Sequence, residues 1–360
     1  MSPNDLSTLP FTAIYGMEDA KRSIECAVVN PNIHTVLIRG GPGSAKTMIS
    51  RAAGRITGLK VVNVPLNVTE EQLFGGMDVD ATIREGRPVV QKGILDRASG
   101  GILYVDDVNL MDQRVLASLL DCVTSGRVIL EREGVSSEYQ CDVILVATMN
   151  PEDSDISSHL LDRFDLCAYT TFPDDEKGRL EVLRRNMEFQ KDPEGYLDRF
   201  KDDEEQVRIT LDRAKRILPL VTISDDLVRV AVEITVRVSA DGHRGDIAMV
   251  NTAKAIAAIN GRDEVLKKDV EEAAMICLAH RRNYSQPPPP PEPDPPEQQE
   301  QEPPEQPPED QQDDDKEDEQ QDDEQQEEQQ EQQDQSPPPQ SDFEQMLEDM
   351  MYEIGEQFRV

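Results

Sequence analysis

A glycine-rich stretch near the start of the chain has the residue types and spacing of a phosphate-binding loop. It follows the strand-like run Thr35–Arg39, precedes a helical pattern and reads Gly40-Gly41-Pro42-Gly43-Ser44-Ala45-Lys46-Thr47. Backbone N–H groups of such a loop, together with the N-terminus of the next helix, bind phosphate oxygens. We expect Lys46 to reach the β- and γ-phosphates and the Thr47 hydroxyl to ligate Mg²⁺. Ala45 stands where the general pattern has glycine. An alanine is tolerable at this position if its backbone angles are helical.

Two adjacent acids follow a second apolar run, Ile102–Val105. We expect Asp106 to hold the Mg²⁺ shell and Asp107 to polarise the attacking water. Glutamate is the usual residue in the second role, and Asp107 is shorter by one methylene. Because a base displaced by about 1 Å can cost on the order of 100-fold in rate, the sequence predicts weak hydrolysis.

Three further polar residues are candidates for the same site. Asn150 follows a buried strand pattern and could orient the attacking water. Arg163 could reach a neighbouring subunit's γ-phosphate as an arginine finger, and the alternative is a surface ion pair with Asp162 or Asp165. Arg244 opens a helical segment and could contact the same phosphate, whereas the alternative for it is a capping or packing role.

Short apolar runs alternate with longer segments of helical periodicity through the first half of the chain. Such runs are typical of strands buried on both faces of a parallel sheet. The alternation therefore predicts an α/β fold in which helices cover the sheet, with one helix within Met111–Thr124. The predicted strands are Thr35–Arg39, Lys60–Val64, Gly101–Asp106, Asp142–Thr148 and Leu166–Phe172.

The strand signal fades over residues 174–284, where we predict a small all-helical domain. Ser224 is expected to cap one of its helices. Asp269, with Glu272 three residues later, indicates the capped start of another helix.

Residues 285–360 differ in kind from the rest of the chain. They carry 27 acidic and two basic side chains, and residues 287–340 contain 15 of the 25 prolines and no aromatic residue. Such a composition cannot bury enough apolar surface to offset the entropy of ordering, so residues 285–341 are predicted to be a disordered, extended spacer. In residues 342–360 apolar side chains recur at helical spacing, which predicts an amphipathic helix that needs a partner surface.

Composition and charge exclude several classes of protein. The formal net charge is −36, of which residues 1–284 contribute −11. A protein that wraps duplex nucleic acid needs a basic surface, and this chain is acidic. Any nucleotide must therefore be bound by a small local site rather than by the surface as a whole. No run approaches the ~20 apolar residues that span a bilayer, and no secretory signal is visible. The five cysteines are far apart and are expected to be reduced, buried thiols rather than metal ligands. These features predict a cytoplasmic protein.

The order of these motifs resembles that of an AAA+ ATPase, and the surrounding sequence is similar to the magnesium chelatase I/D subunit branch. The resemblance covers roughly residues 8–284, and Tyr15 and Gly16 are further candidate nucleotide-binding residues. The segments that carry the resemblance are Leu66–Asp78, Gln91–Leu95, Asp106–Leu110, Gly242–Arg244, Gly261–Val265 and Ala279–Arg282.

The resemblance implies a ring-forming motor, expected to be a hexamer, that binds ATP and Mg²⁺ between protomers. In this family ATP hydrolysis is coupled to insertion of Mg²⁺ into protoporphyrin IX on a separate large catalytic subunit. We therefore divide the chain into an AAA+ nucleotide-binding core (1–173), a helical lid (174–284), a disordered acidic linker (285–341) and an amphipathic helix (342–360).

The linker indicates which of the two subunit types the chain resembles. The family's D subunit has a Pro-rich acidic linker followed by a von Willebrand A domain, and here the linker is present without that domain. We therefore predict the ATPase half of a split or truncated D-type subunit, with a von Willebrand A protein as partner. Asp107 is consistent with this prediction, because D-type modules are often degenerate in their hydrolytic residues.

Two alternatives remain open from the sequence, and a third is disfavoured. The first is an AAA+ assembly chaperone similar to the MoxR family, which also works with von Willebrand A partners. The second is a scaffold that binds ATP without hydrolysing it, which Asp107 would favour. A replicative helicase of the related branch is disfavoured because the body of the chain is acidic.

Overall fold

The computed structural model describes residues 8–281, except 42, 44, 87–88, 133–134, 154–155, 171–175 and 239–241. The predicted linker (285–341) and terminal helix (342–360) lie outside the described residues. So do Pro42 and Ser44 of the predicted phosphate-binding loop.

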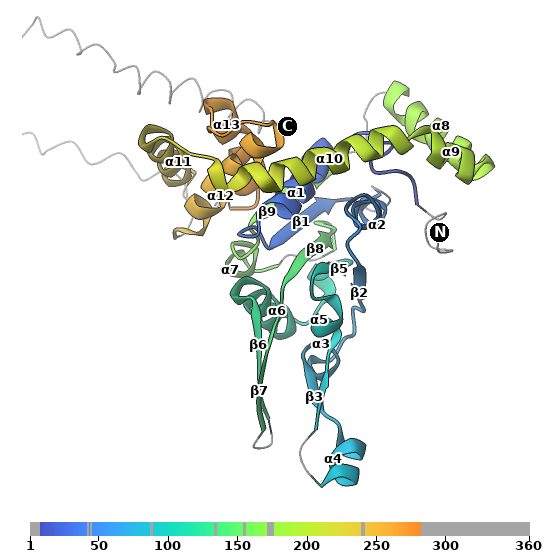
Figure 1. Ribbon diagram of the computed structural model, residues 1–360, viewed down its shortest axis with the longest axis vertical. Helices are drawn as coiled ribbons and strands as arrows, with labels where there is room; N and C mark the ends of the chain where they lie inside the picture. The colour runs from blue at the N-terminus through green and yellow to red at the C-terminus, as the bar shows by residue number, and fades with distance from the viewer. Residues whose placement is uncertain are drawn as a thin grey trace, which may run out of the picture. The chain divides into compact units, whose positions relative to one another are not determined.

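Five parallel strands form the central sheet, and each corresponds to a predicted run. Their order across the sheet is β2-β5-β8-β1-β9 (Figure 1). The central strands are almost wholly buried, which explains why they are continuous apolar runs rather than alternating patterns. Because all neighbours are parallel, the carboxyl ends of the strands lie at one edge of the sheet. The strands are β1 (Thr35–Gly40), β2 (Val61–Val64), β5 (Gly101–Val105), β8 (Val143–Met149) and β9 (Leu166–Thr170).

Helices cover both faces of this sheet, as predicted. On one face α1 (Glu18–Val29) contacts β1, β8 and β9, and α2 (Lys46–Thr57) contacts β2, β5 and β8. On the other face α5 (Ile94–Ala98) and α6 (Gln113–Ser125) enclose an apolar core with the alternate side chains of the strands. The five cysteines are free thiols, and four of them are buried.

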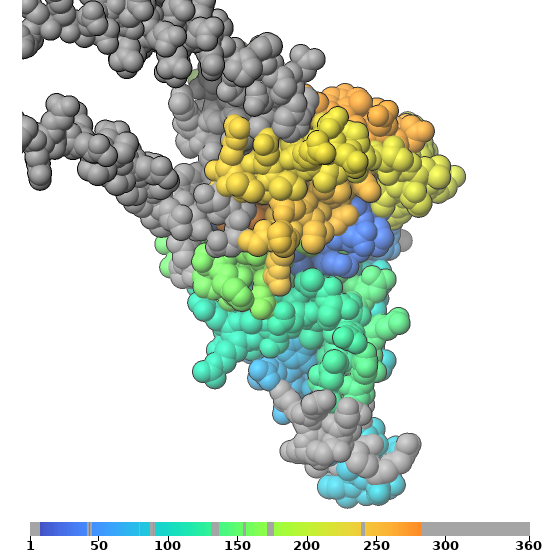
Figure 2. All heavy atoms as spheres, turned by 90° about the vertical axis from the view of Figure 1, so that its left-hand side faces the viewer, coloured from blue at the N-terminus to red at the C-terminus, as the bar shows by residue number. Residues whose placement is uncertain are grey.

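Two small antiparallel sheets extend from this α/β part, and the sequence patterns did not predict them. In Figures 1 and 2, β3 and α4 lie on the side away from α10 and α12. The elements are α3 (Glu70–Phe74), β3 (Gly75–Met77), α4 (Val79–Glu85) and β4 (Val90–Lys92) in one insert, and β6 (Arg127–Arg132) with β7 (Val135–Gln140) in the other.

The described chain beyond residue 175 is almost entirely helical, as predicted. Helix α10 packs on α1 and α2, while α13 packs on β9 and α12 on α1. None of the described helices combines the length and the apolar character that crossing a bilayer requires. The division at residues 173 and 174 stays a prediction, since residues 171–175 are not described. The helices are α8 (Glu176–Lys191), α9 (Pro193–Arg199), α10 (Lys201–Ile217), α11 (Asp225–Arg237), α12 (Arg244–Ile259) and α13 (Lys267–Leu278), with a 3₁₀ turn at Leu218–Leu220.

The structure confirms one predicted helix cap and corrects the other. Ser224 accepts a hydrogen bond from the Leu227 N–H at the start of α11. Helix α13, however, begins at Lys267, and Asp269 lies buried in its first turn. The Asp269 carboxylate accepts both Nη groups of Arg262 at 2.6 Å and the Leu266 N–H at 2.8 Å. The helix-start pattern misled because the main partner of this carboxylate is a guanidinium seven residues earlier.

We expect Asp269→Asn to lower the free energy of unfolding by about 2 kcal/mol, because it removes the buried partner of Arg262, whose side chain is 24% exposed, and weakens charged hydrogen bonds. Urea denaturation of the full chain would measure the change. Asp226→Asn is the matched control, since the Asp226–Arg229 pair is 76% and 75% exposed. It should change the stability by less than about 0.5 kcal/mol. Equal effects of the two substitutions would contradict the assignment.

Candidate functional site

The predicted phosphate-binding loop joins the carboxyl end of β1 to the N-terminus of α2. Lys46 is the first residue of α2, and its side chain turns back over the loop. Its ammonium donates hydrogen bonds to the carbonyl oxygens of Gly40 at 2.6 Å and Gly41 at 2.9 Å, and the residue is 7% exposed. The positive charge and the N–H groups at the start of α2 therefore face the same space, as anion binding requires.

The backbone of Ala45 differs from the expectation. The sequence argument required helical angles there, but Ala45 has φ +60° and ψ +18°, in the left-handed region. A Cβ in that region costs roughly 1–2 kcal/mol. A left-handed residue directly before α2 explains why the general pattern has glycine at this position.

Asp106 is held at the edge of the sheet by hydroxyl groups. Its Oδ1 accepts hydrogen bonds from the Thr148 hydroxyl at 2.6 Å and the Tyr104 hydroxyl at 2.9 Å. Its Oδ2 lies 3.4 Å from the Thr47 hydroxyl oxygen, which is also 3.1 Å from the Tyr104 hydroxyl oxygen. The structure thus brings together the two predicted Mg²⁺ ligands, Thr47 and Asp106. One carboxylate and one hydroxyl beside a phosphate site are donors that Mg²⁺ takes in nucleotide enzymes, so these residues fit the ion.

Asp107 projects beyond the same strand end from a strained backbone. Its φ is +45°, and its N–H donates to the Thr148 hydroxyl at 3.0 Å. Partial burial raises the pKa of the Asp107 carboxyl, the charge of Asp106 raises it further, and Lys46 opposes the rise. A carboxylate with a raised pKa is a stronger proton acceptor.

Asn150 lies buried just after β8 and bonds within the turn that follows. Its amide donates to the Asp153 carboxylate at 2.9 Å and accepts the Glu152 N–H at 3.3 Å. No hydrogen bond joins its side chain to Asp107 among the described residues. Its predicted action on the water therefore rests only on its place after β8, the strand next to β5.

An apolar cavity of about 600 Å³ adjoins the phosphate-binding loop. Its walls come from the N-terminal segment, the loop and α8, and include Tyr15, Ala45 and Leu183. The Arg185 guanidinium lies over the Tyr15 ring, 5.2 Å from its centroid. Tyr15 therefore lines the cavity, and Gly16 follows it with a positive φ of 69°, while their nucleotide-binding role stays a prediction.

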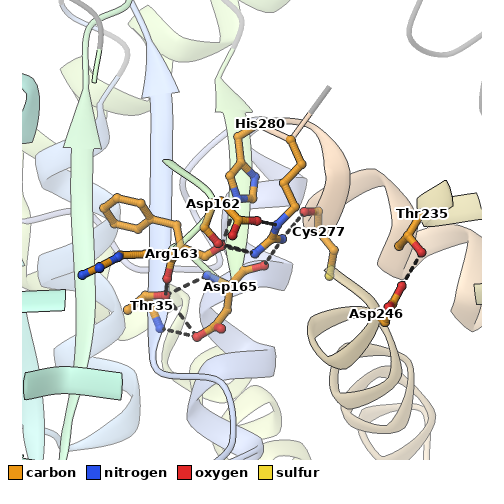
Figure 3. Close-up of polar contacts among 10 residues, drawn as sticks. Thr35, Asp162, Arg163, Asp165, Thr235, Asp246, Cys277 and His280 are labelled. Carbon is orange, nitrogen blue, oxygen red and sulfur yellow. Dashed lines mark hydrogen bonds and ion pairs between the residues drawn. The ribbon is translucent and has the colours of Figure 1, made fainter. Parts of the chain in front are cut away.

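Arg163 lies in the loop between α7 (Ser158–Leu161) and β9, and neither proposed local ion pair forms. Its guanidinium bonds instead to α6, where Nη1 donates to the Asp121 carboxylate at 2.7 Å and to the Ala117 carbonyl at 3.2 Å. Figure 3 shows the Arg163 side chain pointing away from Asp162 and Asp165. Asp162 bonds instead to Arg281, and Asp165 to the N–H groups of His34 and Thr35.

Arg244 is exposed at the first position of α12. Within the described part of the chain, no hydrogen bond or ion pair joins it to the phosphate-binding loop or to the acids after β5. The structure therefore leaves its predicted phosphate contact as a prediction.

Three residues of the site were missed from the sequence. Tyr104 and Thr148 hold Asp106, and Asp153 lies near enough to Asp107 to raise the pKa of its carboxyl. Tyr104 could have been found, because it precedes Asp106 by two residues and so shares its face of the strand. Thr148 requires the register of β5 with β8, which pairs Val105 with Ala147.

Comparisons with known proteins found similar sequences and a similar fold. Residues 35–164 match the family of the AAA domain (dynein-related subfamily), and residues 229–307 match the AAA lid domain. A magnesium-chelatase subunit ChlI homolog of Methanocaldococcus jannaschii is 35% identical over 309 residues, which cover 76% of this chain and 85% of that protein. The magnesium-chelatase subunit ChlI of Olisthodiscus luteus is 33% identical over 298 residues, 76% of this chain and 89% of that one. The solved structure of a putative ATPase from Cytophaga hutchinsonii has the same fold, with a TM-score of 0.56 over 78% of this chain and 86% of its own at 22% identity.

We expect Ala45→Gly to stabilise the protein by about 0.5–1 kcal/mol. Relief of the left-handed strain raises the free energy of unfolding by roughly 1–2 kcal/mol. The greater conformational freedom of glycine in the unfolded chain lowers it by roughly 0.4–1 kcal/mol. Urea denaturation would measure it. Ala52→Gly, in the interior of the same helix, is the control and should destabilise by about 1 kcal/mol. A lower stability of Ala45→Gly than of the unaltered chain would contradict the conclusion that the backbone of Ala45 is strained.

We expect Asp107→Asn to raise the thermal stability at pH 7. Because the folded-state pKa of Asp107 is raised, ionisation of its carboxyl opposes folding, and the amide avoids that ionisation. The gain should shrink as the pH falls through the raised pKa, and should vanish below the ordinary pKa of about 3.9. Melting temperatures of both proteins from pH 7 down to pH 4 would test this, and a gain that grows towards low pH would refute it.

Proposed function

The chain belongs to the magnesium-chelatase subunit ChlI family of AAA ATPases, and we propose that it binds and hydrolyses ATP with Mg²⁺ to drive a metal-inserting chelatase. The reaction served would be insertion of Mg²⁺ into protoporphyrin IX on a separate catalytic subunit. The observation that carries the proposal is the convergence of Lys46, Thr47 and Asp106 where β1 and β5 end. That edge is where α/β sheets bind nucleotides.

Binding of the nucleotide would use the phosphate-binding loop and the apolar cavity together. The loop N–H groups and Lys46 would hold the phosphates, with Lys46 exchanging the Gly40 and Gly41 carbonyls for phosphate oxygens. The adenine would enter the adjoining cavity against Tyr15, since such sites are mostly apolar with few polar groups. Gly16 gives the chain its turn beside that wall.

Hydrolysis would depend on the acids after β5. Thr47 and Asp106 would hold Mg²⁺, which neutralises the charge that develops on the β- and γ-phosphate oxygens. Asp107 would accept the proton of the attacking water, since it follows Asp106 at the end of β5. Asn150, beside Asp153, would orient that water.

The remaining two site residues would act between subunits and from the lid. Arg163 would serve a neighbouring protomer's γ-phosphate as an arginine finger in a ring, expected to be a hexamer, and in doing so would leave Asp121. Arg244 would reach the phosphate from α12. The D-type assignment, the von Willebrand A partner and the large porphyrin-binding subunit stay predictions that accompany this proposal.

A second function, a scaffold that binds ATP without turnover, is favoured by one observation. Asp107 is one methylene shorter than the usual glutamate and stands on a backbone with φ +45°. Measured turnover would distinguish the scaffold from a slow motor.

We expect the purified full chain to hydrolyse ATP slowly and Asp107→Glu to hydrolyse it about tenfold faster, because the longer side chain moves the base towards the water. Lys46→Ala should lose about 100-fold or more, since it removes a preorganised charge from the γ-phosphate. Steady-state phosphate release, with ATP binding measured in parallel, would test all three proteins.

Lys267→Ala is the control for loss of a lysine, because Lys267 pairs with Glu271 on α13 and should leave turnover unchanged. ATP binding without turnover in both the unaltered chain and Asp107→Glu would overturn the motor and leave the scaffold.

A further inference from the structure

One arginine from the helical part of the chain forms hydrogen bonds with the loop that carries Arg163. Arg281 follows α13, and its side chain is 1% exposed. Its Nε donates to the Asp162 carboxylate at 3.0 Å, and its Nη2 donates to the carbonyls of Asp162 at 2.9 Å and Phe164 at 2.7 Å. Its Nη1 donates to the carbonyls of Asp165 at 3.2 Å and Cys277 at 2.5 Å. Five acceptors thus match the five N–H groups of a guanidinium.

His280 makes a second contact with the same loop. Its Nε2 lies 2.9 Å from the Phe164 carbonyl, and the ring is buried. Burial, together with the positive charge of Arg281, holds the pKa of His280 well below its ordinary value. The ring is therefore neutral, and its Nε2 donates to Phe164.

The opposite side of the loop is fixed to the sheet. The Asp165 carboxylate accepts the N–H groups of His34 at 2.8 Å and Thr35 at 3.0 Å, where β1 begins. The Asp165 N–H donates to the Thr35 hydroxyl at 2.7 Å. Asp162 and Phe164 are thus held from the helical part and Asp165 from both sides. The Arg163 side chain points away from Asp162 and Asp165 (Figure 3) and bonds to α6 instead.

We propose that Arg281 is a positioning residue, which holds the Asp162–Asp165 loop from the helical part so that Arg163 is presented to the neighbouring subunit. This inference rests on the proposed role of Arg163. A lysine would replace Arg281 only in part, because a compact ammonium cannot reach all of the acceptors, which are spread over four residues. The bond to Cys277 also joins the end of α13 to the loop, so a shift of that helix end would move the base of Arg163.

If Arg281 only stabilised the protomer, its substitution would reduce turnover equally in either of the two subunits that meet at an interface. Mixed assemblies separate the two roles. Lys46→Ala supplies Arg163 but no working phosphate-binding loop, and Arg163→Ala supplies the loop but no finger. Their mixture should recover ATP turnover at interfaces where the two intact halves meet.

Arg281→Gln is then introduced into one partner at a time. In the Lys46→Ala partner it should reduce the recovered turnover about tenfold or more, because a finger displaced by about 1 Å loses most of its effect. In the Arg163→Ala partner it should leave the recovered turnover within about twofold. Arg281→Lys should give a smaller loss with the same asymmetry, and serves if the glutamine variant does not fold.

Arg262→Gln is the matched control. Arg262 also bonds to a carboxylate of the helical part, Asp269, but its hydrogen bonds among the described residues are to Asp269 and Glu264. It should reduce turnover equally from either partner.

The outcomes distinguish the two proposals. No recovery in the Lys46→Ala and Arg163→Ala mixture would overturn the finger role of Arg163 and the positioning role with it. Recovery that Arg281→Gln lowers equally from both partners, or from neither, would overturn the positioning role alone.

Discussion

The hydroxyl of Thr148 joins the two acids at the end of β5, donating to Asp106 at 2.6 Å and accepting the Asp107 N–H at 3.0 Å. This contact exists because β5 and β8 are parallel neighbours in a register that pairs Val105 with Ala147. A slip of one residue would turn every side chain of a strand to the opposite face. The phosphate-binding loop depends on the same constraint, since β8 also pairs with β1. The buried aliphatic residues that fix the register therefore fix the site.

Backbone strain is concentrated around this edge of the sheet. Three non-glycine residues in the described part of the chain have positive φ: Met17, Ala45 and Asp107. Met17 and Ala45 line the cavity beside the phosphate-binding loop, and Asp107 is the candidate base. Such conformations cost about 1–3 kcal/mol each and persist where the surrounding structure imposes them. Here the imposing structure is the packed sheet with α1 and α2.

The sequence was informative where the physics is local. The five strands were predictable because each is a short run buried on both faces, and the loop after β1 was predictable because glycines and a lysine recur at fixed spacing. Errors arose where the deciding partner is distant or the backbone is unusual. Asp269 lies in the first turn of α13, not at its N-cap, and pairs with Arg262, and Ala45 has left-handed backbone angles. The partner of Arg163 on α6 lies 42 residues earlier in the chain, and no periodicity reveals it.

The cavity beside the loop has walls from three segments that are far apart in sequence: the N-terminal segment, the phosphate-binding loop and α8. Any occupant of the cavity therefore acts as a cross-link between the α/β part and the first helix beyond it. If the affinity of a ligand differs between two positions of α8, binding of that ligand shifts the equilibrium between those positions by the same free energy. Helix α8 also exposes Leu180 and Met187, which are 60% and 68% accessible. A protein that bound those side chains more tightly at one position of α8 than at another would thus change the affinity of the cavity for its occupant without touching it.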